Sequence, residues 1–199
     1  MRTGTVELGI RDERVNPCDH IALLWESPEE FAEGVGFLEI GLRGTDHCVI
    51  FGHEDANQKI HEILTSRGFD IDALRAAGRL TTLGGRDAGD LMLAEIGGVF
   101  EGAVRRGAPL IRLLGNIGWG RADWPDEHDI LAFEARVTGA AKAFPCIITC
   151  MYDVGALPSR LVIHGAFETH PLTICGNVLR ENPLYRRIEE LIASHDIPE

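Results

Sequence analysis

The chain has 199 residues, of which 45% are hydrophobic and 25% are charged, as in ordinary globular proteins. Its formal net charge of −12 disfavours direct binding to nucleic acids and to anionic membranes, because both are themselves negatively charged. No apolar run approaches the roughly 18–20 residues of a membrane span, and residues 1–6 lack the apolar core of a signal peptide. We therefore expect a cytoplasmic protein.

Residues 1–19 are polar and include the segment Asn16–Pro17 near their end. We expect them to form an N-terminal arm that is either mobile or an edge strand. From His20 onward the apolar pattern becomes regular, and the length of the chain suits one domain of generous size. Residues 20–199 are therefore expected to form a single domain.

The first regular element is a short apolar strand at 21–25, followed by a tight turn and a helix at 28–42. Ser27 is a favourable N-cap, Pro28 suits the first helical position, and Glu30 completes a capping box. A nucleotide-binding protein carries its phosphate loop at such a turn, but here the turn has three glutamates and neither glycine nor lysine. The pattern predicts the layout of a nucleotide-binding unit without its phosphate site.

Strands and helices alternate along the rest of the chain. Further strands are predicted at 47–52, 80–83, 109–114, 146–152 and 170–175. Further helices are predicted at 55–67, 71–77, 90–106, 126–144, 156–165 and 184–195. Strands that alternate with helices of this length are typical of a mainly parallel sheet with helices on both faces. We therefore predict an α/β fold in three layers.

Ligands of open parallel sheets bind beyond the carboxyl ends of the strands. The residues predicted at this edge are mainly aromatic and acidic: Trp25, Glu26, His53, Trp119, Tyr152 and Asp153. Such a set suits a small uncharged or cationic molecule better than an anion. Two members also have a structural interpretation, because Trp119 can cover the core and His53 can belong to the N-cap of the next helix.

The five cysteines are irregularly spaced and form no CxxC motif, which is typical of buried thiols in a reducing compartment. Cys146 and Cys150 share one face of a strand but lie roughly 13 Å apart, too far to bind one metal ion together. No histidine spacing typical of a metal site and no GxSxG motif is present. We therefore predict no metal, no cofactor and no catalytic residue. A metal or haem sensor that uses His20, His53, His170 or the cysteines is an alternative.

Several short segments resemble, in order, those of the MEDS domain, a sensory domain of dichloromethane-responsive regulators in methylotrophs that also occurs in methanogens. The matching segments are residues 20–25, 41–44, 48–51, 112–115, Trp119, Phe133–Glu134, 150–153 and His170–Pro171. Together they span about residues 20–185. Residues 84–90 depart from the family, which usually carries aromatic residues here, so the identity of the ligand is not transferred.

The resemblance implies a KaiC/RecA-like core without a phosphate-binding loop and a non-enzymatic sensory role. By position it nominates His20, Arg112, Trp119, Glu134, Cys150, Tyr152 and His170. Glu134 is expected either to neutralise Arg112 in the core or to contact the ligand. The implied partners are a small organic ligand and either a signalling protein or a second copy of the chain. A degenerate RecA-like nucleotide-binding ATPase is a further alternative.

Overall fold

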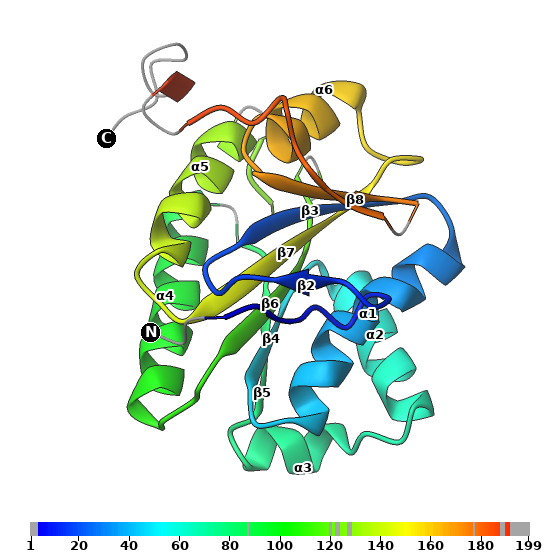
Figure 1. Cartoon of the computed structure of the whole chain (residues 1–199), viewed down its shortest axis with the longest axis vertical. Coiled ribbons are helices and arrows are strands. Elements are labelled where there is room, and N and C mark those ends of the chain that lie inside the picture. The colour runs from blue at the N-terminus through cyan, green and yellow to red at the C-terminus, as the bar shows by residue number, and fades with distance from the viewer. Residues whose placement is uncertain are drawn as a thin grey trace.

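One mixed sheet runs through the centre of the protein (Figure 1). The computed structural model describes residues 4–86, 88–119, 121, 124–126, 129–176, 178–187 and 190–191. In spatial order the strands are β5 (Leu80–Gly84), β4 (His47–Gly52), β6 (Ile111–Asn116), β7 (Cys146–Asp153), β3 (His20–Trp25), β8 (Leu172–Cys175) and β9 (Val178–Glu181). Neighbouring strands are parallel except β8 and β9, which pair antiparallel.

Helices cover both faces of this sheet, as Figure 1 shows for α1 and α2 on one side and α4 and α5 on the other. Their bounds are α1 Pro28–Arg43, α2 Glu54–Ser66, α3 Ile71–Ala76, α4 Gly89–Arg105, α5 Ile130–Ala141 and α6 Ser159–Leu161. A π-helix, η2, follows at Val162–Phe167. An apolar core forms on each face of the sheet, because alternate side chains of each strand point to opposite faces. The predicted three-layer α/β fold is confirmed.

The turn between β3 and α1 contains one of the two hydrogen bonds of the predicted capping box, while the Glu30 carboxylate accepts from Glu26 rather than from the N-cap Ser27. The backbone N–H of Glu30 donates to Ser27 Oγ over 3.2 Å, and the N–H of Glu26 donates to Glu30 Oε2 over 2.9 Å. The α1 face that carries Phe31, Val35 and other apolar residues is then buried against the sheet. The Glu30 carboxylate therefore satisfies a turn N–H that a phosphate would contact in a phosphate loop.

The segment before His20 folds onto the domain. Strands β1 (Val6–Glu7) and β2 (Arg14–Val15) pair antiparallel in a separate two-stranded sheet, so they are not an edge of the main sheet. Leu8, Ile10 and Val15 are buried in the same core as α1. Apolar burial therefore anchors this segment.

The region after β7 differs most from the predicted elements. The expected helix at 156–165 is replaced by the short α6 and the π-helix η2. Strand β9 was not predicted; Gly176, with φ +55°, suits the tight turn that precedes it.

The helix predicted at 184–195 does not begin at Leu184, because the buried Asn182 side chain holds a turn there. Asn182 Nδ2 donates to the carbonyls of Phe167 and His170, and its Oδ1 accepts from Leu184 N. Much of the remaining stretch lies outside the described residues. Within the described part of the chain, no helix has the length and apolarity needed to cross a membrane.

Candidate functional site: an edge cavity and a buried cluster

A cavity of about 770 Å³ lies at the carboxyl edge of the sheet. Its lining includes four residues predicted for this edge, namely Trp25, His53, Trp119 and Asp153. Glu26 does not belong to the lining, since its side chain is exposed on the turn. Tyr152 and Cys150 do not line it either: they lie on the opposite face of β7 from Asp153 and are buried in the core under α5.

Aromatic rings form much of the cavity wall. Trp119 is only 2% exposed and packs against Phe133 and Trp124, with ring centroids 4.8 and 5.2 Å apart. Trp25 meets Phe31 edge-on at 5.0 Å. Trp119 therefore combines the two roles considered for it, because it covers the core and also faces the cavity.

Three lining residues carry a buried side-chain N–H without a hydrogen-bond partner among the described residues. They are the indoles of Trp25 and Trp119 and the amide of Asn116. A buried donor without a partner costs about 1–3 kcal/mol. An acceptor atom that reached these groups would remove that cost.

The two basic side chains that line the cavity, Lys59 and Arg121, each contact another lining residue. Asp55 lies 3.4 Å from Arg121, and Lys59 lies 4.4 Å from the centre of the Phe31 ring. His53 is the N-cap of α2, where its Nδ1 accepts from Ala56 N over 3.3 Å. Burial lowers the pKa of His53, so its ring is neutral at pH 7. His53 therefore has both roles: it is the N-cap of α2 and it also lines the cavity.

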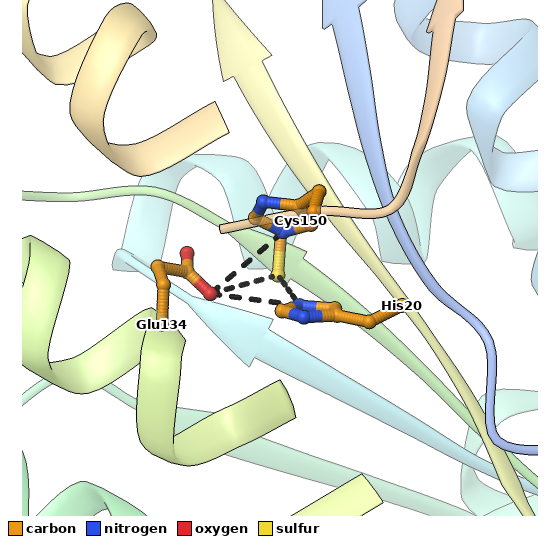
Figure 2. A group of neighbouring side chains, drawn as sticks. His20, Glu134 and Cys150 are labelled. Carbon is orange, nitrogen blue, oxygen red and sulfur yellow. Dashed lines mark hydrogen bonds and ion pairs between the residues drawn. The ribbon is translucent and has the colours of Figure 1, made fainter. Parts of the chain in front are cut away.

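A second group of polar side chains is buried beneath the sheet on the α5 side. Figure 2 shows His20 from β3, Glu134 from α5 and Cys150 from β7 pointing toward one another. His170, which precedes β8, completes what we call the buried cluster: His20, Glu134, Cys150 and His170. No member is more than 4% exposed. One ligand-type atom from each member lies within 4.8 Å of those of the others.

Burial favours the neutral form of every group in this cluster. It raises the pKa of Glu134 to about 8, although the Tyr152 hydroxyl donates to Glu134 Oε1 over 2.8 Å. Burial also raises the pKa of Cys150 well above its usual value, and it lowers the pKa of His170 to about 3. In the absence of another charge, the cluster is a set of neutral groups.

The pairing of Glu134 with Arg112 considered from the sequence is wrong. Arg112 Nε donates to Asp46 Oδ2 over 2.7 Å on the α1 face of the sheet, while Glu134 lies on the α5 face. Glu134 Oε2 is instead 3.5 Å from His20 Nε2 and 3.7 Å from Cys150 Sγ.

Sequence reasoning missed several residues of both sites. Thr138 lies one helical turn after Glu134 and contacts His20, while Lys59 and Asn116 line the cavity. The spacing of Thr138 from Glu134 places both on one face of the predicted helix, which was a usable signal. No local pattern predicted Lys59 as a lining residue, because it lies in the middle of α2 and the sequence does not reveal which side of this helix faces the cavity.

The fold and these sites define a three-layer α/β domain with a ligand-sized cavity at the carboxyl edge of its sheet. Residues 19–171 match the family model of MEDS, the methanogen/methylotroph DcmR sensory domain. The chain therefore belongs to this family of sensory domains. A comparison with curated proteins gives no match.

Proposed function

We propose that this sensory domain binds a small organic molecule in the cavity at the carboxyl edge of the sheet. The observation that carries the proposal is the composition of the lining, which includes all three tryptophans of the chain: Trp25, Trp119 and Trp124. Ligand sites typically combine aromatic walls with a few polar groups, in cavities of about 300–1,000 Å³. The position of the cavity also agrees with the usual ligand site of parallel sheets.

The lining favours an uncharged ligand that carries a hydrogen-bond acceptor. The buried N–H groups of Trp25, Trp119 and Asn116 have no partner in the part of the chain that the structure describes, and they would donate to a carbonyl, ether or hydroxyl oxygen. Acidic and basic side chains occur together around the cavity, so neither sign of charge dominates. An uncharged molecule avoids the desolvation that a buried ion requires.

The signal is proposed to leave the cavity through the loop after β7. Ala156, Leu157 and Pro158 belong to the lining, and the chain continues from them directly into α6 and η2. A ligand that shifts this loop would move α6 as well. A signalling protein, or a second copy of the chain, would then respond to the changed position of α6.

Intrinsic fluorescence tests the proposal, because every tryptophan reports on the cavity. We expect a saturable change in emission on titration with at least one compound from a panel of short-chain ketones, ethers and alcohols. The same compound should raise the melting temperature, since a ligand at 100 times its Kd stabilises the folded state by about 2.7 kcal/mol. A folded protein that shows neither response to any compound would refute the proposed site.

Two matched variants locate the ligand. Trp119→Phe removes a buried, unpaired N–H and keeps an aromatic ring, and it should weaken binding about tenfold, equivalent to about 1.4 kcal/mol. Trp124→Phe is the control, because its ring also lines the cavity but its N–H is not among the buried unpaired donors. Equal losses in both variants would show that the Trp119 N–H does not contact the ligand.

A further inference from the structure

The buried cluster combines four side chains of the kinds that bind transition metals. Two imidazoles, a thiol and a carboxylate come from β3, α5, β7 and the segment before β8. We propose that His20, Glu134, Cys150 and His170 bind one divalent transition-metal ion, with Zn²⁺ as the expected occupant. This site is separate from the edge cavity and does not depend on the function proposed for that cavity.

The spacing of the ligand atoms fits four-coordinate binding. A tetrahedral zinc ion with ordinary bond lengths separates its nitrogen, oxygen and sulfur ligands by about 3.3–3.6 Å. In the buried cluster, His20 Nε2 lies 3.3 Å from Cys150 Sγ and 3.5 Å from Glu134 Oε2. Glu134 Oε2 lies 3.7 Å from Cys150 Sγ and 3.8 Å from His170 Nε2. Small side-chain rotations therefore suffice to surround one ion.

Hydrogen bonds outside the cluster orient both imidazoles for metal binding. His170 Nδ1 lies 2.9 Å from the carbonyl of Gly165 and 3.1 Å from that of Ala166, and a carbonyl can only accept. His170 Nδ1 therefore carries the proton, and Nε2 presents a lone pair to the cluster.

His20 is oriented in the same way. Its Nδ1 lies 2.8 Å from Thr138 Oγ1, and this hydroxyl has the carbonyls of Glu134 and Thr169 as acceptors for its own proton, each at 3.0 Å. Thr138 thus accepts from His20 Nδ1–H, which leaves a lone pair on Nε2. Hydrogen bonds of this kind to the second ring nitrogen accompany most histidines that bind metals.

The hydrogen bonds of the metal-free cluster are incomplete. The neutral Glu134 carboxyl carries one O–H, but its Oε2 lies 3.8 Å from His170 Nε2, beyond hydrogen-bond distance. His170 Nε2 is fully buried and has no hydrogen-bond partner among the described residues. The single Cys150 S–H can donate to His20 or to Glu134 but not to both. A cation at the centre would satisfy both imidazole lone pairs at once.

Charge and ligand type select the ion. A Cys150 thiolate and a Glu134 carboxylate together carry −2, so a divalent ion leaves the buried site neutral. The thiolate and the two imidazoles favour Zn²⁺ over Mg²⁺ or Ca²⁺, which prefer oxygen ligands. Four buried protein ligands leave no open position, as in structural zinc sites. The ion would therefore tie together β3, α5, β7 and the segment before β8.

Metal analysis of the whole chain, purified without a metal-binding tag, is the first test. We expect about one zinc ion per chain by elemental analysis. After removal of the metal with a chelator, titration with Co²⁺ should give the visible absorption of tetrahedral cobalt and a thiolate-to-cobalt charge-transfer band. One equivalent of another divalent transition metal, lost in Cys150→Ser, would support the site as well.

Variants of the two cysteines on β7 provide a matched pair. Cys150→Ser should abolish the charge-transfer band. Cys146→Ser should retain it, because Cys146 is equally buried on the same face of the strand but donates to the carbonyl of Ala141. Thr138→Val removes the acceptor for His20 Nδ1 and should weaken metal binding about 10- to 100-fold.

The proposal is overturned if the folded wild-type chain binds neither Zn²⁺ nor Co²⁺ stoichiometrically. It is also overturned if Cys146→Ser and Cys150→Ser lose the cobalt spectrum to the same extent while both stay folded. If Cys150→Ser does not fold, the wild-type cobalt spectrum and the affinity of Thr138→Val decide the question.

Discussion

Arg112 offers the most direct test of how the N-terminal segment is held. Its side chain is 4% exposed, and the guanidinium donates to Asp46 Oδ2 over 2.7 Å and to the carbonyl of Glu7 over 2.8 Å. It also donates to the carbonyl of Leu8 over 3.2 Å, and it lies 5.2 Å from the centre of the Phe37 ring. One side chain thus joins β6, α1 and the strand β1. Replacing it should loosen all three.

Arg112→Met keeps an unbranched apolar chain and removes every one of these hydrogen bonds. Loss of one partner of a buried ion pair usually costs about 3–5 kcal/mol, because the other charge stays buried. The Asp46 side chain is 13% exposed and can regain some water, which places the expected loss near the lower end, at about 3 kcal/mol. With an m-value of about 2 kcal/mol/M, the urea midpoint should fall by about 1.5 M.

Urea unfolding followed by circular dichroism measures this loss. Arg43→Met is the matched control, because Arg43 forms an exposed pair with Glu39 at 2.8 Å and should change stability by less than about 1 kcal/mol. The N-terminal segment of Arg112→Met should also exchange its amide protons faster. If Arg112→Met loses no more stability than Arg43→Met, Arg112 does not anchor this segment.

Two further predictions concern pH and nucleotides. Burial lowers the pKa of His47 below the value of about 6.5 that it has in the unfolded chain. As the pH falls below 6.5, the unfolded state therefore takes up a proton more readily than the folded state, and the free energy of unfolding decreases. His47→Gln should therefore lose less stability than wild type between pH 7 and pH 5 in urea titrations, and equal losses would contradict this assignment. Calorimetry with a tenfold excess of Mg–ATP should give no binding signal, because the Glu30 carboxylate caps the turn N–H of Glu26; saturable heat would instead favour a nucleotide-binding role.

Local sequence signals predicted much of the fold. Ser27 and Pro28 predicted the start of α1 correctly, since Ser27 is its N-cap and Pro28 its first residue. The rule for parallel sheets also placed Trp25 and Trp119 at one edge, where both line the cavity. The start of a helix depends on residues adjacent in the sequence, and the edge at which a strand ends depends on strand direction alone. Both can therefore be predicted without knowing the order of the strands.

The remaining features depend on strand order and on which face each side chain occupies. Arg112 and Glu134 were considered as a pair, although Arg112 points to the α1 face and Glu134 to the α5 face. His20 and Cys150 meet because β3 lies beside β7, with Ala22 paired to Cys150. No local pattern reveals that adjacency. The local pattern at 156–165 predicted an α-helix and did not indicate that Val162–Phe167 forms a π-helix instead.

The position of β3 in the sheet has a consequence for synthesis of the protein. This apolar strand leaves the ribosome before both of its neighbours, because β7 and β8 begin only at Cys146 and Leu172. At ~5–20 residues per second, the strand waits on the order of 6–24 s for β7 and longer for β8. Both of its edges lack strand partners during that time, so a nascent chain interrupted before Cys146 presents an aggregation-prone template. Molecular chaperones that cover apolar strands are expected to matter most for this protein in that interval.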